Sequence, residues 1–249
     1  MIAILRADGG QGPPLVYLPG IDGSGELLLG TAARLERRFR LVRLAWRPDG
    51  DDTYEALARA VVALLESLRV GRALFLAESF GGALGLQLAL DHPGHVRGVA
   101  IVNGFAHFRR RARLALTALV LPLVPSPLFR LGRRALGPRE LIGPRRDPEV
   151  ERLFLALPGI ECDEGYARRL RMIRALDLRP RLAEIRRPVA LYASERDRVV
   201  DSVFQAREMA ARLPDATMEI LPASGHVVLP FADEPWVERM EALAARAGK

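Results

Sequence analysis

Cysteine is almost absent from this chain, since Cys162 is the only one among 249 residues. A single thiol cannot form an internal disulfide, so the sequence has no need of an oxidising compartment. Residues 1–8 do not combine the basic leader, long apolar stretch and small-residue cleavage site of a secretory signal. We therefore expect a cytoplasmic protein.

Lysine and asparagine are equally scarce, because Lys249 and Asn103 are the only ones. The net charge of +7 is thus due almost entirely to arginine, which is as typical of the codon usage of a GC-rich genome as of an anionic partner. Aromatic residues make up only 6% of the chain, and no base-stacking pattern accompanies the arginines. We expect no nucleic-acid partner.

Histidine and cysteine form no cluster with the spacing of a metal site. The glycines at 20, 23 and 25 are followed neither by the Gly-Lys-Ser of a phosphate loop nor by Rossmann spacing. The sequence therefore predicts neither a metal nor a cofactor.

The chain does contain short apolar runs that alternate with amphipathic stretches, and its 49% hydrophobic content is enough for a large core. This alternation predicts the α/β class, with a mostly parallel sheet and helices on both faces. Strands are expected at residues 2–6, 15–18, 41–46, 73–77, 96–103, 189–193 and 217–221. Helices are expected at residues 25–38 with Ser24 as the cap, at 53–69, up to His92, at 201–212 and at 233–246.

The pattern changes between residues 105 and 187. Prolines break this segment into short helices, and nineteen arginines stand against nine acidic residues. It therefore carries the positive charge, and the rest of the chain is mildly acidic. We divide the chain into a core, residues 1–104 and 188–249, and an arginine-rich helical insertion, residues 105–187.

An apolar run beginning at Leu74 reaches Ser79 in a turn of small residues and passes directly into a second apolar run. A strand that breaks sharply into a helix strains the turn residue, and the small side chains at Ala77 and Gly81 let the strand and the helix approach. Such a turn is a nucleophile elbow, which lifts a hydroxyl above the sheet beside the first amides of a helix. The alternative is a serine that only caps the helix.

Asp197 and His226 each follow a predicted strand, at 189–193 and 217–221. Because parallel strands end at one edge of a sheet, we expect both residues beside Ser79. A neutral imidazole can take the proton of a serine hydroxyl, and a carboxylate fixes the tautomer of that imidazole. The alternatives are a capping role for His226 and simple ion pairing for Asp197.

Other titratable residues have structural interpretations. Asp201 competes for the acid role, but it begins a predicted helix and is typical of an N-cap. His92 and His95 flank a Pro-Gly pair at a helix end, so we expect them to be structural. The role of His107 is left open.

The chain resembles the α/β-hydrolase superfamily with a helical cap, and the matching segments run from about residue 15 to 230. They are the oxyanion loop Leu18-Pro19-Gly20-Ile21-Asp22-Gly23, the elbow Ala77-Glu78-Ser79-Phe80-Gly81-Gly82, the acid loop at 194–200 and the histidine loop Ser224-Gly225-His226. The chain order Ser, Asp, His is that of the fold. The resemblance implies that Ser79 is the nucleophile, Asp197 the orienting acid and His226 the base, with the backbone N–H groups of Ile21 and Phe80 as the oxyanion hole.

Two positions depart from the family pattern. Pro19 stands where histidine is often found, which should spare the Ile21 donor but change what braces the oxyanion loop. Ala77 stands in place of the first glycine of the elbow. Glu78, next to the nucleophile, is a hypothetical buried partner of the oxyanion loop.

The resemblance implies a serine hydrolase that cleaves carboxylic esters through an acyl-enzyme. Alternatives on the same residues are acyl transfer to an alcohol, because residues 19–23 resemble the loop of some hydrolase-like acyltransferases, and hydrolysis of thioesters or carbon–carbon bonds. A non-catalytic hydrolase-like binding protein is a third hypothesis. Serine at the elbow argues against dehalogenases and epoxide hydrolases of this fold, which use aspartate there.

Residues 114–124 form an apolar run too short and too broken by proline to span a bilayer of about 30 Å. We expect this run to roof an apolar acyl pocket, with Arg109, Arg110, Arg111 and Arg113 solvated around it. The alternative is a weak peripheral contact with an anionic membrane. Both interpretations predict a small apolar ester as the substrate.

Overall fold

The computed structural model describes residues 2–50, 52–109, 114, 120, 124–145, 147–156 and 164–248. The predictions on Cys162, on the arginines at 110, 111 and 113 and on most of the run at 114–124 lie outside these residues. Among the helices of the described residues, none is both long and apolar enough to cross a membrane.

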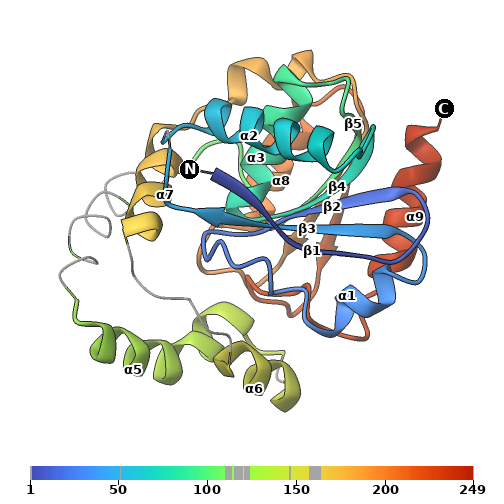
Figure 1. Ribbon diagram of the computed structural model, residues 1–249. Helices are drawn as coiled ribbons and strands as arrows, with labels where there is room; N and C mark the ends of the chain where they lie inside the picture. The colour runs from blue at the N-terminus through green and yellow to red at the C-terminus, as the bar shows by residue number, and fades with distance from the viewer. Residues whose placement is uncertain are drawn as a thin grey trace.

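Seven strands form one sheet in the order β1-β3-β2-β4-β5-β6-β7 (Figure 1). β1 runs antiparallel to β3 at one edge, and the other neighbouring strands are parallel. The strands are β1 (Ile2–Gly9), β2 (Pro14–Leu18), β3 (Arg40–Arg47), β4 (Ala73–Glu78), β5 (Val96–Val102), β6 (Val189–Ser194) and β7 (Ala216–Leu221). The predicted α/β class with a mostly parallel sheet is confirmed.

Helices pack on both faces of this sheet. One buried cluster contains side chains of α2 (Tyr54–Ser67), α3 (Phe80–Asp91) and α8 (Ser202–Ala210), and the other contains those of α1 (Gly30–Leu35) and α9 (Trp236–Ala247). The two groups lie on opposite sides of the strands (Figure 1). β4 supplies both clusters because successive side chains of a strand point to opposite faces: Phe75 joins the first cluster and Leu74 the second.

Local chemistry explains where these helices begin. The side chain of Thr53 accepts a hydrogen bond from the Ala56 N–H at 3.1 Å, which caps α2. α1 is shorter than the predicted helix at 25–38, because Gly25 and Leu29 have φ values of 73° and 45°, which a right-handed helix does not allow. Ser24 accepts from Glu26 N within this turn instead of capping α1.

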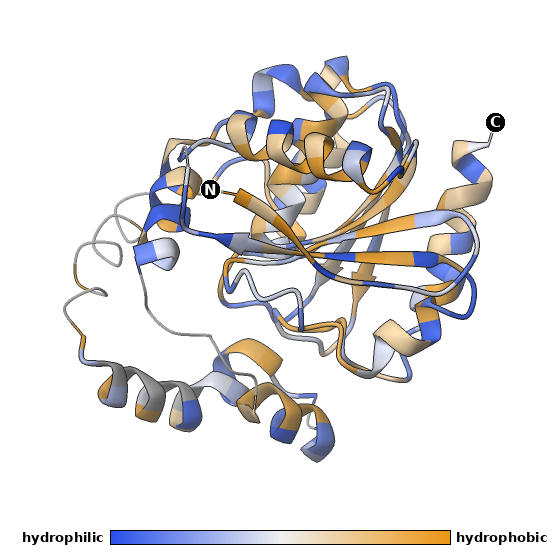
Figure 2. Ribbon diagram, in the orientation of Figure 1, coloured by the Kyte–Doolittle hydropathy of each residue, from blue (hydrophilic) through white to orange (hydrophobic). Residues whose placement is uncertain are grey.

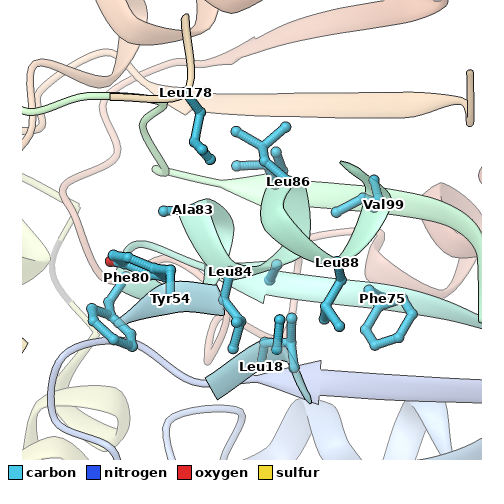
Figure 3. Packing of buried hydrophobic residues seen from close by; sticks show 14 of the residues in the cluster. Leu18, Tyr54, Phe75, Phe80, Ala83, Leu84, Leu86, Leu88, Val99 and Leu178 are labelled. Atoms are coloured by element: carbon cyan, nitrogen blue, oxygen red, sulfur yellow. The ribbon is translucent and has the colours of Figure 1, made fainter. Parts of the chain in front are cut away.

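α3 is the most enclosed helix of the site region, since residues 80–89 are all buried. Its side chains pack against strand residues such as Leu18 and Phe75 (Figure 3), and the ring of Phe80 lies 4.8 Å from that of Tyr54 of α2. Burial on all sides fixes the N-terminus of α3 at the edge of the sheet, directly after β4.

The segment between β5 and β6 carries the remaining described helices. They are α5 (Ser126–Gly137), the π-helical turn η2 (Pro138–Ile142), α6 (Pro148–Ala156), α7 (Glu164–Ala175) and the 3₁₀ turn η3 (Arg179–Glu184). α5 and α6 lie side by side, and α6 has an apolar and a polar side (Figures 1 and 2). Val150 and Phe154 of α6 join the buried cluster of α1 and α9. Leu170 and Ile173 of α7 join the buried cluster of α2 and α3. The division of the chain at 104/105 and 187/188 stays a prediction.

Candidate active site

Ser79 lies in a strained turn between β4 and α3. Its φ of 51° and ψ of −111° are rarely adopted by a residue with a side chain. The turn is held by two hydrogen bonds, from Ser79 N to the Val102 carbonyl at 2.9 Å and from Gly82 N to the Ser79 carbonyl at 2.9 Å. The sharp turn from strand to helix that was predicted at Ser79 is therefore present. Ser79 occupies the N-cap position of α3, but its side chain makes no capping hydrogen bond.

Small residues permit this turn. A Cβ added to Gly81 would lie 2.2 Å from the Leu18 carbonyl oxygen, so a larger residue at 81 would push α3 away from β2. Ala77 is accommodated because it faces Gly85 of α3, where an added Cβ would come within 3.3 Å of the Ala77 methyl group. The departure from the family pattern at 77 is thus matched by a glycine one turn into the helix.

The three residues predicted to act together do meet at the carboxyl edge of the sheet. His226 Nε2 lies 3.0 Å from Ser79 Oγ, and His226 Nδ1 lies 2.8 Å from Asp197 Oδ2. Both contacts are satisfied by a neutral imidazole that carries its proton on Nδ1, donates it to the carboxylate and accepts from the hydroxyl. This arrangement can transfer the serine proton to the imidazole.

The side chain of Asp197 is buried, and its own loop holds it. Its Oδ1 accepts from the N–H groups of Val199 at 2.8 Å and Val200 at 3.2 Å, and the Ser202 hydroxyl donates to Oδ2. Burial alone would raise the pKa of this carboxyl, but His226 and these hydrogen bonds hold it below the usual value. For His226, burial opposes protonation, while the Asp197 carboxylate outweighs burial and raises the imidazole pKa above its usual value.

Two backbone N–H groups, from the oxyanion loop and from the start of α3, are the candidates to bind an oxyanion beside the serine. The oxyanion loop closes with a hydrogen bond from Gly23 N to the Gly20 carbonyl at 3.1 Å, and a Cβ on Gly20 would lie 3.7 Å from Ser79 Cβ. Phe80 is the first residue of α3, so its N–H has no acceptor within the helix. In the described part of the chain, the N–H of Ile21 likewise donates to no acceptor. Both groups can therefore bind an oxyanion.

A cavity of about 360 Å³ opens beside Ser79 and His226. Its walls are mostly apolar and come from the oxyanion loop, the acid loop and the segment between β5 and β6, including Phe105, Phe154 and Leu170. Leu114 is the one described wall residue from the expected apolar roof at 114–124. The volume is within the range of sites for small organic ligands.

A family model described as the alpha/beta hydrolase fold matches residues 13–233. The chain belongs to this family. It is 29% identical over 229 residues to a protein of Caulobacter sp. strain K31 named carbamate hydrolase RutD, a match that covers 85% of this chain and 83% of that protein.

Solved structures agree with this assignment. A hydrolase from Pseudomonas aeruginosa PA01 has a TM-score of 0.81 at 26% identity and covers 98% of this chain and 93% of its own. The enol-lactonase from Burkholderia xenovorans LB400 has a TM-score of 0.79 at 25% identity, with 98% and 94% covered.

Asn103 supports the histidine loop of this alpha/beta hydrolase, a role that the sequence did not reveal. It is buried at the end of β5 with a φ of 51°, and its Nδ2 donates to the His226 carbonyl at 2.7 Å and to Ser194 Oγ at 2.9 Å. Its Oδ1 accepts from Ser194 N at 2.8 Å. The amide thus joins the ends of β5 and β6 to the proposed base. The one sequence feature that could have pointed to this role is that Asn103 is the only asparagine in the chain, and that scarcity is equally typical of the codon usage of a GC-rich genome.

η2 holds the same loop from the other side. The Ile142 carbonyl accepts from Gly225 N at 3.1 Å, and the Leu141 carbonyl accepts from Val227 N at 2.8 Å. His226 therefore lies between two backbone hydrogen bonds to the segment that separates β5 from β6.

Glu78 is buried next to the nucleophile and lines the cavity. The hydroxyl of Tyr17 from β2 donates to it, so its partner is a strand residue and not the oxyanion loop as hypothesised. Burial raises the Glu78 pKa to about 7, the Tyr17 hydrogen bond opposes the shift, and the nearby Asp22 adds to it. This carboxyl can therefore exchange a proton near neutral pH.

The remaining titratable candidates lie elsewhere. Asp201 is at the N-cap position of α8, but with a φ of 59° it makes no capping hydrogen bond, and its carboxylate lies 3.2 Å from Arg109 Nη1. His95 Nε2 is 3.3 Å from Glu66, and His107 Nδ1 is 3.2 Å from Glu208. These two histidines do not line the cavity.

Proposed function

We propose that this alpha/beta hydrolase is a serine hydrolase that cleaves carboxylic esters of apolar acyl groups through an acyl-enzyme. The observation that carries the proposal is the pair of contacts at 3.0 Å and 2.8 Å that links Ser79, His226 and Asp197 at an apolar cavity. We also propose that residues 105–187 are its cap, because α6, α7 and η2 supply walls of that cavity.

In the first half-reaction, Ser79 Oγ bonds to the ester carbonyl carbon while its proton moves to His226 Nε2. The negative charge that develops on the carbonyl oxygen is stabilised by the N–H groups of Ile21 and Phe80. The carbon–oxygen bond to the alcohol then breaks, and the alcohol leaves with the proton from His226. The acyl group remains on Ser79.

In the second half-reaction, water replaces the alcohol. His226 takes one proton from the water as its oxygen bonds to the acyl carbon, and the same N–H groups hold the second oxyanion. Collapse returns the proton to Ser79 Oγ and releases the carboxylic acid. Asp197 keeps its charge throughout and stabilises the imidazolium.

The lining of the cavity favours a substrate with an apolar acyl group. Apolar side chains such as Phe105, Phe154 and Leu170 give a favourable transfer free energy for an alkyl or aryl chain. Asp22 and Glu78 line the cavity near Ser79, and their acidic side chains disfavour a substrate carboxylate. We expect neutral esters to be preferred over esters of dicarboxylic acids.

Other substrates use the same residues. The relatives named carbamate hydrolase favour a test of carbamates, whose carbonyl carbon Ser79 would attack in the same way. Acyl transfer, thioester hydrolysis and carbon–carbon bond hydrolysis stay alternatives, and a non-catalytic binding role is the weakest, because it gives no reason for the contacts that join Ser79, His226 and Asp197.

The test is turnover of p-nitrophenyl esters of graded chain length, with a p-nitrophenyl carbamate and an acceptor alcohol in separate arms. We expect hydrolysis that improves with acyl length until the cavity is filled. Ser79→Ala and Asp197→Asn should each lower kcat by about 10⁴-fold, since these residues act as a unit. Asp201→Asn, the matched carboxylate outside the site, should leave kcat close to that of the parent.

Two results would overturn the assignment. Full ester turnover by Ser79→Ala would show that Ser79 is not the nucleophile. An inactive Asp201→Asn beside an active Asp197→Asn would show that the acid had been misplaced.

A further inference from the structure

The oxyanion loop lacks the histidine that often stands at position 19, so its conformation has to be held by other groups. Trp46 of β3 holds two of its carbonyls. The indole Nε1 donates to the Pro19 carbonyl at 3.2 Å, and the Trp46 backbone N–H donates to the Gly23 carbonyl at 2.8 Å. These bonds fix the two ends of the loop.

The middle of the loop is held from α7. Arg169 is only 3% exposed, and its Nε donates to the Ile21 carbonyl at 2.6 Å. Its guanidinium also lies against the turn, because a Cβ added to Gly23 would be 3.2 Å from Arg169 Nη1. Charged donors form stronger hydrogen bonds to carbonyls than neutral ones.

The bond from Arg169 acts on the peptide that follows the proposed oxyanion donor. The peptide before Ile21 is held through the Gly20 carbonyl, which accepts from Gly23 N, and the peptide after it is held through the Ile21 carbonyl. Because each peptide unit is planar, fixing both units fixes the two backbone dihedral angles of Ile21. The direction of the Ile21 N–H is set by the same restraint.

We propose that Arg169 is a positioning residue for the oxyanion hole, which takes over the bracing of the loop where Pro19 has replaced histidine. This inference rests on the proposed function. Arg169 touches no reacting atom; it acts through Ile21. The same helix presents Leu170 and Ile173 to the cavity, so one element both forms the wall of the acyl site and orients the oxyanion donor.

The test compares Arg169→Met with Arg169→Lys, and uses Arg168→Met as the matched control. Arg168 is the neighbouring residue on α7, but its guanidinium pairs with Glu164 and Asp52 and not with the loop. We expect Arg169→Met to lower kcat by about 100-fold, the effect of a small misplacement of a catalytic group. KM should change by less than about 3-fold, because the bond acts in the transition state. Arg169→Lys keeps a charged donor and should recover part of the loss.

A second readout separates positioning from folding. Trifluoromethyl ketones form a serine adduct that carries an oxyanion, so their inhibition constant should rise in Arg169→Met by the same factor as kcat/KM falls. All rates are divided by the fraction of enzyme that a fluorophosphonate titrates, which removes unfolded protein from the comparison. If Arg169→Met does not fold, Arg169→Lys and Arg169→Gln carry the same comparison.

The inference is overturned if titrated Arg169→Met keeps the parent kcat, or if its kcat falls while the inhibition constant of the ketone does not change. An equal loss in Arg168→Met would also overturn it, because the effect would then belong to α7 as a whole. If the proposed serine-hydrolase function is wrong, the result is different, because the parent protein itself would not react with the fluorophosphonate at Ser79.

Discussion

Glu78 links the proposed active site to pH at the scale of a single residue. It is 2% exposed, accepts from Tyr17 and has its pKa raised from 4.5 to about 7, chiefly by burial. A carboxyl whose pKa is higher in the folded than in the unfolded state keeps its proton in the folded protein while the unfolded chain loses it. The stability that this proton contributes is complete below about pH 4.5 and is lost as the pH rises through about 7.

We therefore predict that Glu78→Gln removes a pH-dependent part of the stability. The amide can still accept from Tyr17 but does not ionise, so the variant should gain stability relative to the parent as the pH rises from about 4.5 to about 7. A rise of the Glu78 pKa from 4.5 to about 7 corresponds to about 3 kcal/mol. Urea unfolding at about pH 5 and about pH 8 measures it, with the exposed Glu164→Gln as the control. An equal difference between parent and Glu78→Gln at both pH values would contradict the account.

Sequence reasoning located Ser79, Asp197 and His226 because each stands in a short motif directly after an apolar run. It could not locate Asn103 and Arg169 as site residues. Their hydrogen-bond partners, the carbonyls of His226 and Ile21, lie 123 and 148 positions away in the chain. Such contacts depend on which strands and helices become neighbours, and local spacing carries no information about that.

At the scale of elements, the π-helical turn η2 and the histidine loop are in direct backbone contact. A Cβ added to Gly225 would lie 2.4 Å from the Ile142 carbonyl oxygen and 2.7 Å from that of Leu141. No flexible side chain separates the two backbones, so only glycine fits at 225. The mostly parallel sheet followed from alternation in the sequence, whereas the strand order, this contact and the short α1 depend on which segments become neighbours, and alternation does not encode that.

Gly225→Ala should therefore separate η2 from the histidine loop. We expect a loss of about 1–3 kcal/mol in the free energy of unfolding, as for other overpacked sites, and a fall in kcat because His226 is displaced. Gly71→Ala is the matched control, since an added Cβ there meets nothing within 4 Å. Thermal unfolding and ester turnover on both variants measure these effects. Parent-like stability and kcat in Gly225→Ala would show that the contact with η2 is not needed.

At the scale of the whole molecule, we propose a weak peripheral membrane contact through the segment between β5 and β6. Leu128 and Leu131 of α5 are 58% and 64% exposed, one helical turn apart, with the exposed Arg134 three residues on. Arg109 contributes less, because its guanidinium pairs with Asp201 and stacks 3.9 Å from the ring centre of Phe204. Each free arginine near an anionic surface would add about 1 kcal/mol of binding.

Co-sedimentation with liposomes of phosphatidylserine and phosphatidylcholine tests this contact. We expect binding at low salt that falls at high salt, because salt screens exposed charges, and a rise in ester turnover above the micelle concentration of the substrate. The double variant Leu128→Glu with Leu131→Glu should abolish binding, while Ile220→Glu, at an exposed apolar residue of β7, should not. Absence of salt-dependent binding in the parent would leave the segment as a wall of the acyl site only.

The central claim is that Ser79 is a nucleophile activated by His226, and labelling with a fluorophosphonate tests it most directly. The reagent modifies a serine only when a neighbouring base removes its proton and an oxyanion hole holds the developing charge. Peptide mass spectrometry of the labelled parent should find one modified serine, Ser79, and His226→Gln should remain unlabelled while folded. A folded parent that stays unlabelled, or a label on another serine, would contradict the account.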